Sequence, residues 1–377
     1  MNKPLTVTFG ALNEAIGTEF RVAITPESAA RLLKAGVQPV IESKAGLKSG
    51  FADADYEAAG AKILPREEIL RKSNAVAFIS LPDSSVTSSQ AKGSFAIGLF
   101  GSLANKNAPQ QFESAGVTAL DLTLLPRQLS KAQSMDALSS QASVAGYKAV
   151  LTAAMEFKAF FPMMSTAAGT IKPAAVLILG AGIAGLQAVG TAKRLGAVVT
   201  AYDVRPAAKE EVLSLGAKFL NLESYGCPDF SAGQGKGGYA RELTAEEKRA
   251  QQDAVDKAAA SFDIIITTAQ VPGRKPPVLL TKAGVNGLKR GSVIVDLAAS
   301  SLGGNVEGSQ PEKTIETENG VKIIGAPALA ATAPKTASNL LARNIADAIT
   351  HFVKDGAIKW TPEDELAVLA ISGKKAE

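Results

Sequence analysis

A glycine-rich turn between an apolar strand and a helix is the feature that most constrains the fold of this chain. Residues 176–185 read Val-Leu-Ile-Leu-Gly-Ala-Gly-Ile-Ala-Gly, so Gly180, Gly182 and Gly185 directly follow an apolar run. Gly180 allows a tight turn, Gly182 lets the backbone approach a pyrophosphate, and Gly185 lets the helix pack closely on the strand. The helix N-terminus then presents free N–H groups and its positive dipole end to the phosphates. The pattern predicts a dinucleotide-binding βαβ unit.

The residues that follow this turn agree with the prediction. A helix is expected over 186–195, and the apolar run 198–202 predicts a second strand ending at Asp203, 18 residues after Gly185. A carboxylate there accepts both hydroxyls of a ribose and repels a 2′-phosphate, which favours NAD(H) over NADP(H). Arg205 is the one contrary feature. A glycine turn that binds nothing is the structural alternative, because the motif alone is weak in a chain with 34 glycines.

Length and composition set the class of protein. A chain of 377 residues is too long for one ordinary core and suits two domains. With 46% hydrophobic residues, a net charge of +4 and no basic run, the sequence indicates a globular protein and argues against a nucleic-acid partner. The single cysteine, Cys227, excludes an internal disulfide and a cysteine-based metal cluster, and it fits a cytoplasmic setting. The sequence shows no signal-peptide core and no membrane-spanning apolar run, so we expect a soluble chain with no metal site.

Histidine occurs once, as His351. Dehydrogenases that oxidise an alcohol or an amine need a group that takes the substrate proton, commonly His or Lys. His351 lies in an amphipathic helical pattern over 336–354, which favours a structural role. The composition therefore points away from a reaction that removes a proton from its substrate.

Short apolar runs alternate with helical patterns along the chain, which predicts parallel strands with crossover helices. We expect an α/β protein with two doubly wound Rossmann-like domains and an interdomain cleft. The first domain should comprise 1–137 and 327–377, and the NAD(H)-binding domain 138–326. A long helix over 133–161 should cross between them, and helix 336–354 should return to the first. The expected strands are 5–9, 37–42, 75–80, 95–100 and 117–122, then one from residue 176, 198–203, 263–269, 292–298 and 321–324, with a helix at 26–35.

A long segment without a helix or strand pattern interrupts the second domain at residues 225–246. Loops of this length are usually functional or disordered. The glycines at 233, 235, 237 and 238 suit a mobile lid with Tyr239 at its tip. A surface insertion is the alternative.

The polar run 126–141 lies at the expected domain junction and reads Pro-Arg-Gln-Leu-Ser-Lys-Ala-Gln-Ser-Met-Asp-Ala-Leu-Ser-Ser-Gln. Its Arg, Gln, Asp and Ser side chains suit the binding of a nicotinamide ribose and carboxamide in a cleft. They equally suit a solvated loop. The residues alone leave both interpretations open.

Five motifs together resemble one family: Arg21–Glu27, Arg127–Ser140, Gly180–Gly185, Gly237–Ala240 and Gly291–Ala298. In this order, over about residues 5–350, the chain resembles the NAD(H)-binding component of proton-translocating nicotinamide nucleotide transhydrogenase, and it also resembles the related alanine dehydrogenases. The resemblance implies a soluble dimer that binds NAD(H) and docks on a separate NADP(H)-binding component. It also implies a membrane component that couples hydride transfer to proton translocation. The chain then corresponds to the separately encoded first portion of the α subunit, cytoplasmic and peripheral to the inner or plasma membrane.

The resemblance also assigns roles to individual residues. Arg127, Gln133, Asp136 and Ser139 match a polar loop around the nicotinamide, and Tyr239 matches a tyrosine that closes on bound nucleotide. The cofactor-binding residues that we expect are Gly180, Gly182, Ile183, Ala184, Gly185, Asp203, Val204, Arg205, Ala269, Val271 and Pro272. The chain departs from the family pattern by one extra residue between Arg127 and Gln133, by Gln270 where Leu is more usual, and by a slightly longer segment at 299–302.

Other departures separate the two related families. Alanine dehydrogenases share the Arg21 motif but need a Lys near 75–81 and a His near 95–105, where this chain has Phe78 and Leu99-Phe100. An acid is also missing after the Asp-Leu-Ala at 296–298. Hydride transfer between two nicotinamides moves no substrate proton and needs only positioning of the rings. We therefore expect transhydrogenation with NADP(H) on a partner; a free-standing alanine-dehydrogenase-like oxidoreductase and a NAD(H)-sensing module are the alternatives.

Overall fold

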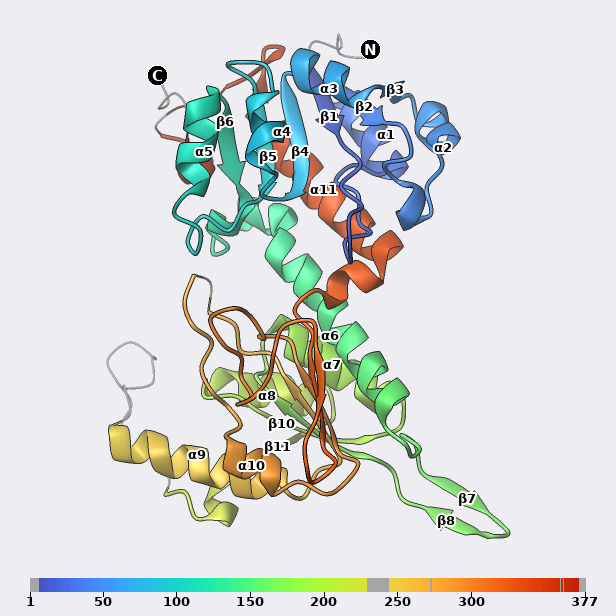
Figure 1. Cartoon of the computed structure of the whole chain (residues 1–377), viewed down its shortest axis with the longest axis vertical. Helices are drawn as coiled ribbons and strands as arrows, with labels where there is room; N and C mark the ends of the chain where they lie inside the picture. Colours follow the sequence, from blue (N-terminus) through green and yellow to red (C-terminus); the bar gives the residue numbers. More distant parts are fainter. Residues whose placement is uncertain (1–6, 229–243, 272, 360, 362, 373–377) are drawn as a thin grey trace. The chain divides into compact units, whose positions relative to one another are not determined.

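The computed structural model describes residues 7–228, 244–271, 273–359, 361 and 363–372. The chain forms two compact units: residues up to Gln141 together with those from Ala330 onward, and Ala142–Leu329. Each unit contains one large parallel sheet with helices packed on it (Figure 1). The predicted α/β class with doubly wound, Rossmann-like topology is confirmed.

The first unit is built on a six-stranded sheet with the strand order β3-β2-β1-β4-β5-β6, in which all neighbours are parallel. The order reverses direction between β1 and β4, which is the doubly wound topology. Its central strands are almost wholly buried because helices cover both faces. The strands are β1 (Val7–Ala11), β2 (Val37–Glu42), β3 (Lys62–Leu64), β4 (Ala75–Ser80), β5 (Phe95–Leu99) and β6 (Thr118–Asp121).

The helices of the first unit begin at recognisable caps. Thr25 accepts a hydrogen bond from the Ser28 N–H, the Ser28 hydroxyl accepts one from the Thr25 N–H, and Pro26 occupies the first turn of α1. Some residues of the Arg21–Glu27 motif therefore serve to start a helix. The helices are α1 (Pro26–Lys34), α2 (Asp53–Ala58), α3 (Arg66–Lys72), α4 (Ser84–Ser88), α5 (Ala108–Ala115) and α11 (Pro334–Phe352), with 3-10 turns at Leu47–Ser49, Leu122–Leu124, Ser130–Met135 and Glu365–Leu369. A further 3-10 turn, Leu329–Thr332, begins at the last residue of the second unit and leads into the first.

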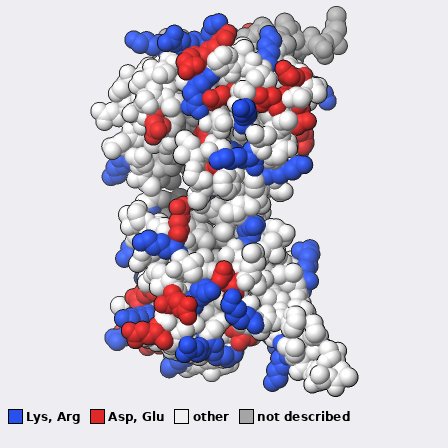
Figure 2. All heavy atoms as spheres, turned by 45° about the vertical axis from the view of Figure 1, so that its right-hand side comes forward, with Lys and Arg blue, Asp and Glu red and all other residues white. Residues whose placement is uncertain are grey.

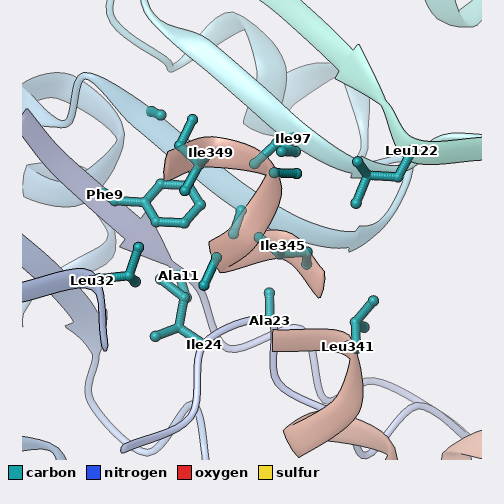
Figure 3. Packing of buried hydrophobic residues seen from close by; sticks show 14 of the residues in the cluster. Phe9, Ala11, Ala23, Ile24, Leu32, Ile97, Leu122, Leu341, Ile345 and Ile349 are labelled. Atoms are coloured by element: carbon teal, nitrogen blue, oxygen red, sulfur yellow. The ribbon is translucent and has the colours of Figure 1, made fainter. Parts of the chain in front are cut away.

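The C-terminal helix α11 packs into the core of the first unit, although the whole second unit precedes it in the sequence. Leu341, Ile345 and Ile349 are fully buried in the cluster that also holds Phe9 and Ile24 (Figure 3). At the end of the helix, His351 lies 2.7 Å (Nε2 to Oδ2) from Asp364, so the single histidine is paired within this unit. Two short strands, β16 (Val353–Lys354) and β17 (Ala357–Ile358), follow the helix.

The second unit is built on a seven-stranded sheet with the order β11-β10-β9-β12-β13-β15-β14, in which only the edge strand β14 is antiparallel. Helix α6 (Ala137–Glu156) brings the chain into this unit. The strands are β9 (Ala175–Leu179), β10 (Val198–Tyr202), β11 (Lys218–Phe219), β12 (Ile264–Thr267), β13 (Val293–Asp296), β14 (Thr314–Glu316) and β15 (Lys322–Gly325). The other helices are α7 (Ile183–Arg194), α8 (Ala207–Ser214), α9 (Ala245–Ala259) and α10 (Lys282–Asn286), with a 3-10 turn at Leu222–Tyr225.

Several features differ from the sequence prediction, among them the start of α6, a hairpin and the short strands β3, β11 and β14. The long helix expected over 133–161 begins only at Ala137, because 130–135 forms a 3-10 turn and Asp136 accepts the N–H of Ser139 at the helix start. An antiparallel hairpin of β7 (Met164–Thr166) and β8 (Gly169–Ile171) was not predicted. In Figure 1 the hairpin extends away from the body of the second unit.

Charged side chains of both signs are mixed on the face of the molecule drawn in Figure 2. Among the described residues on that face, basic side chains do not merge into one continuous surface. This distribution agrees with the small net charge of +4.

The packing of α11 in the core of the first unit gives a stability prediction. Ile345→Ala removes a fully buried side chain and should lower the free energy of unfolding of the first unit by about 2–5 kcal/mol. Leu340→Ala, on the same helix but 36% exposed, should change it by about 1 kcal/mol or less. Urea unfolding followed by circular dichroism measures both. Equal losses from the two variants would contradict the burial of this helix face.

Candidate functional site

The glycine turn after β9 has the geometry that the sequence predicts for binding a phosphate group. Gly180 has a φ of +99°, and a Cβ added there would lie 2.7 Å from the Thr268 hydroxyl. A Cβ on Gly185 would collide with the Gly180 carbonyl oxygen, so helix α7 lies directly against the turn. A Cβ on Gly182 would have no atom of the described residues within 4 Å. The turn is therefore closed on its inner side and open at Gly182.

Helix α7 begins in this open space. Gly182 occupies its N-cap position and has no side chain to cap the helix, and Ile183 in the first turn is 44% exposed. The first N–H groups of a helix need partners from outside the helix, and an anionic group supplies them favourably. On the other side, a Cβ on Gly146 would collide with the Ala184 carbonyl oxygen, so α6 supports the start of α7 closely. The donors and the space at Gly182 suit a dinucleotide pyrophosphate.

Asp203 follows β10 and is a nearly buried acid, with 9% of its side chain exposed. One oxygen, Oδ2, accepts the Ala181 N–H at 2.8 Å, and the other, Oδ1, accepts the Arg205 N–H at 2.9 Å. The Arg205 guanidinium also donates to both oxygens, through Nε at 3.0 Å and Nη2 at 3.1 Å. Burial raises the pKa of Asp203, but the hydrogen bonds from Arg205 and Ala181 outweigh burial and hold the pKa below its ordinary value. The acid is therefore ionised.

Arg205 and Val204 are more exposed than Asp203. The Arg205 side chain is 60% exposed, and its hydrogen bonds to Asp203 raise the pKa of the guanidinium further. Val204 is 62% exposed. A ribose that binds the Asp203 carboxylate would therefore replace a guanidinium that is itself largely exposed to solvent.

The loop after β12 completes this edge of the second sheet. Thr268 donates its hydroxyl to the Gly180 carbonyl at 3.0 Å, and the Ala269 N–H donates to Asn305 at 2.9 Å. Val271 is 42% exposed. Because β10, β9 and β12 are parallel neighbours, the residues at their carboxyl ends meet at the point where the strand order reverses, where open α/β sheets bind ligands.

The polar run at 126–141 lies in the first unit, and its predicted residues are in different environments. Arg127 and Gln133 are exposed. Asp136 accepts two hydrogen bonds from Ser139, one from the N–H at 2.9 Å and one from the hydroxyl at 2.5 Å. This pair fixes the first turn of α6, which is a structural role that the sequence did not indicate.

The predicted site residues thus fall into three groups. Gly180–Gly185, Asp203–Arg205, Ala269 and Val271 lie together at the carboxyl edge of the second sheet. The polar run belongs to the first unit. Tyr239 and Pro272 lie outside the described residues.

Sequence reasoning missed two residues that hold these groups in place. Asn344 of α11, 8% exposed, donates to the Ser134 carbonyl at 2.7 Å and accepts the Ser140 hydroxyl at 2.7 Å, so it anchors the polar run. Asn305 is fully buried beside the loop after β12. The only local signal for Asn305 is its position after two glycines that follow a buried strand.

The Arg21 side chain forms hydrogen bonds with two other side chains of the first unit. Its guanidinium donates to both carboxylate oxygens of Glu19, at 2.8 Å and 2.7 Å, and to Gln141 at 2.8 Å. Only 14% of its side chain is exposed. Glu19 therefore compensates the charge of Arg21, which is unfavourable for binding a substrate carboxylate.

Comparison with known proteins agrees with this geometry. Residues 10–145 match the family model "Alanine dehydrogenase/PNT, N-terminal domain", and residues 149–375 match "Alanine dehydrogenase/PNT, C-terminal domain". The chain is 42% identical to the first of the separately encoded portions of NAD(P) transhydrogenase subunit alpha of Rickettsia prowazekii, over 94% of this chain and 92% of that protein. A crystal structure of transhydrogenase from Sinorhizobium meliloti superposes with a TM-score of 0.87 and 37% identity, over 98% of this chain and 99% of that one.

Alanine dehydrogenases are more distant. Alanine dehydrogenase 1 of Staphylococcus aureus is 26% identical, over 92% of this chain and 88% of that protein.

Among the residues that the structure describes, none of the helices has the length and apolar character that a bilayer crossing requires.

The two kinds of glycine in the turn should respond differently to a methyl group. Gly182→Ala should fold as stably as the wild type, because its Cβ meets open space, but should weaken NADH binding at least about tenfold by occupying the pyrophosphate position. Gly185→Ala should instead lower the melting temperature, since its Cβ collides with the Gly180 carbonyl. Thermal melting and NADH titration separate the effects. Unchanged NADH affinity in Gly182→Ala would refute this position for the pyrophosphate.

Proposed function

The chain belongs to the alanine dehydrogenase/PNT family, and on that basis we propose that it is the NAD(H)-binding subunit of a proton-translocating transhydrogenase. In this proposal a hydride passes directly between NAD(H) on this chain and NADP(H) on a partner component. A membrane component couples the transfer to proton translocation. The observation that carries the proposal is the open, uncapped turn at Gly182 beside the ionised Asp203, in a chain whose transhydrogenase relatives match nearly its full length.

NAD(H), when bound, supplies the hydride-carrying nicotinamide, and the residues of this chain only bind and orient it. The N–H groups at the start of α7 would bind the pyrophosphate, and Asp203 would accept the ribose hydroxyls. Arg127, Gln133, Asp136 and Ser139 orient the nicotinamide end, and Tyr239 closes over the nucleotide. The residues that we assign to the nucleotide are Gly180, Gly182, Ile183, Ala184, Gly185, Asp203, Val204, Arg205, Ala269, Val271 and Pro272.

The charge of Asp203 supports a preference for NAD(H). The acid is ionised and nearly buried, and it would lie beside the 2′-phosphate of NADP(H), which it would repel. Arg205 limits this repulsion because its guanidinium already contacts the same carboxylate. We therefore propose NAD(H) as the nucleotide of this chain and NADP(H) as that of the partner.

Transhydrogenation fits the rest of the chain better than oxidation of an amino acid. Phe78 is fully buried in an apolar cluster, so β4 offers an aromatic side chain where an alanine dehydrogenase needs a lysine. Arg21 is already paired with Glu19. Direct hydride transfer needs neither a proton acceptor nor a carboxylate-binding arginine, only two rings held at reacting distance.

We also propose that the subunit is a homodimer, peripheral to the cytoplasmic side of the membrane. The hairpin β7–β8 supports the dimer, because a two-stranded hairpin is only marginally stable alone in water. Met163 is 64% exposed and Ile171 is 43% exposed, and residues 164–171 include no charged side chain. A shallow, open hollow lined mainly by apolar residues, together with Arg194, includes Phe161 and Pro162 just before the hairpin in the sequence, and we propose that it contacts a second copy.

The central test is a transfer assay. This protein is mixed with the NADP(H)-binding component from the same source, and NADPH-driven reduction of an oxidised NAD analogue is followed by its shifted absorbance. We expect transfer only when both proteins are present. Intact NADH binding without transfer would favour the NAD(H)-sensing alternative, and NADH oxidation with pyruvate and ammonia would favour an alanine-dehydrogenase-like enzyme.

The assigned role of Gln133 gives a kinetic prediction. Gln133→Ala should slow hydride transfer at saturating nucleotide by at least about tenfold, while NADH affinity changes only about twofold, because the side chain orients the ring rather than holding the nucleotide. Gln128→Ala, at another exposed residue of the same run, is the matched control. If Gln133→Ala loses hydride-transfer rate and NADH affinity to the same extent, the proposed role in orienting the ring is wrong.

The dimer proposal predicts a change in molar mass. Met163→Glu places a charge on the exposed apolar surface beside the hairpin and should shift the protein from dimer to monomer in light scattering after gel filtration. Leu47→Glu makes the same change at a 57% exposed position of the first unit and should leave the dimer intact. A monomeric wild type, or a dimeric Met163→Glu variant, would show that the hairpin does not join two copies.

A further inference from the structure

One peptide group in the glycine turn is held from both ends by side chains of neighbouring strands. The carbonyl of Gly180 accepts the Thr268 hydroxyl at 3.0 Å, from the end of β12. The N–H of the next residue, Ala181, donates to Asp203 Oδ2 at 2.8 Å, at the end of β10. The carbonyl oxygen and the N–H of a single peptide plane are thus fixed in opposite directions.

This restraint matters because glycine does not by itself hold its peptide in one orientation. Gly180 has a φ of +99°, a region that glycine enters freely, and it has no side chain that would limit rotation of its peptide. If the Gly180–Ala181 peptide rotated, its carbonyl oxygen would turn away from Thr268 and its N–H away from Asp203. The N–H groups that follow, at the start of α7, would then lose their common direction.

Asn305 fixes the neighbouring peptides in the same manner. Its fully buried amide accepts the Ala269 N–H at 2.9 Å and donates to the Ala269 carbonyl at 2.9 Å and to the Pro277 carbonyl at 2.7 Å. Both backbone groups of Ala269 are therefore bound by one side chain. Since Ala269 directly follows Thr268, Asn305 sets the position from which the Thr268 hydroxyl reaches Gly180.

We propose that Thr268 and Asn305 are positioning residues that orient the Gly180–Ala181 peptide for the dinucleotide pyrophosphate. This inference rests on the proposed function, because it requires that NAD(H) binds at the glycine turn. Neither side chain belongs to the residues that we assign to the nucleotide. Thr268 acts through the Gly180 carbonyl, and Asn305 acts through the Ala269 peptide.

The test uses Thr268→Val, which removes the hydroxyl at nearly constant volume, and Thr268→Ser, which keeps it. Affinities for NADH, ADP and adenosine are measured by calorimetry and by competition, at a temperature at which every variant is folded. We expect Thr268→Val to weaken NADH and ADP by the same factor, about fivefold to tenfold, as one hydrogen bond is lost. The affinity of Thr268→Val for adenosine, which has no phosphate, should fall less. Thr268→Ser should bind all three ligands as the wild type does.

Asn305→Asp tests the hydrogen bonds between Asn305 and the backbone of Ala269 and Pro277. The carboxylate keeps the size and the acceptor but cannot donate to the Ala269 and Pro277 carbonyls, so NADH affinity should fall about tenfold or more. Asn221→Asp is the matched control, because Asn221 is an exposed residue whose side chain accepts the Glu223 N–H at 2.9 Å, a role that a carboxylate keeps. It should bind NADH as the wild type does.

Three outcomes would overturn the inference: wild-type NADH affinity in a folded Thr268→Val, equal losses for adenosine and ADP, or no recovery in Thr268→Ser. If Thr268→Val does not fold, Asn305→Asp decides, and unchanged NADH affinity in that variant overturns the inference. A wild-type protein that binds neither NADH nor ADP refutes the proposed function itself. The two failures are therefore distinguishable.

Discussion

The close approach of α7 to the turn after β9 is the contact on which the carboxyl edge of the second sheet depends. Because Gly185 has no side chain, the helix backbone lies directly on the Gly180 carbonyl, and the same carbonyl is left free to accept the Thr268 hydroxyl. This arrangement joins three parallel strands, since Asp203 holds the adjoining Ala181 N–H. The helix N-terminus is therefore aimed by contacts on its inner side, and its outer side stays open at Gly182.

Several residues whose sequence motifs suggest a binding role also form structural contacts within the chain. Thr25 and Pro26 start α1, Asp136 and Ser139 fix the first turn of α6, and Arg21 is paired with Glu19. A structural partner does not exclude a binding role, because Asp136 and Ser139 then present their polar atoms from a rigid helix start. Arg21 differs, since its charge is already compensated. The polar atoms of this chain thus suit orientation of a bound group better than proton transfer.

The larger elements were predictable because their signals are local. Strands β2 and β4 have the limits expected from their apolar runs, which are continuous because both faces of a parallel sheet are buried. The start of α6 was placed too early, since a polar 3-10 turn and a helix share the same residue types. The hairpin β7–β8 and the edge strand β14 are short and largely exposed, so no apolar pattern marked them.

The sequence by itself determined the α/β class, the doubly wound order of elements and the glycine turn between β9 and α7. Each of these follows from hydrophobic periodicity or from backbone freedom that glycine alone provides. Only the tertiary structure decided which core residues α11 contacts, that Arg205 covers Asp203, and that Asn305 binds both backbone groups of Ala269. These features depend on contacts whose partners are set by packing and by the pairing of buried polar groups, and a linear pattern does not encode such partners.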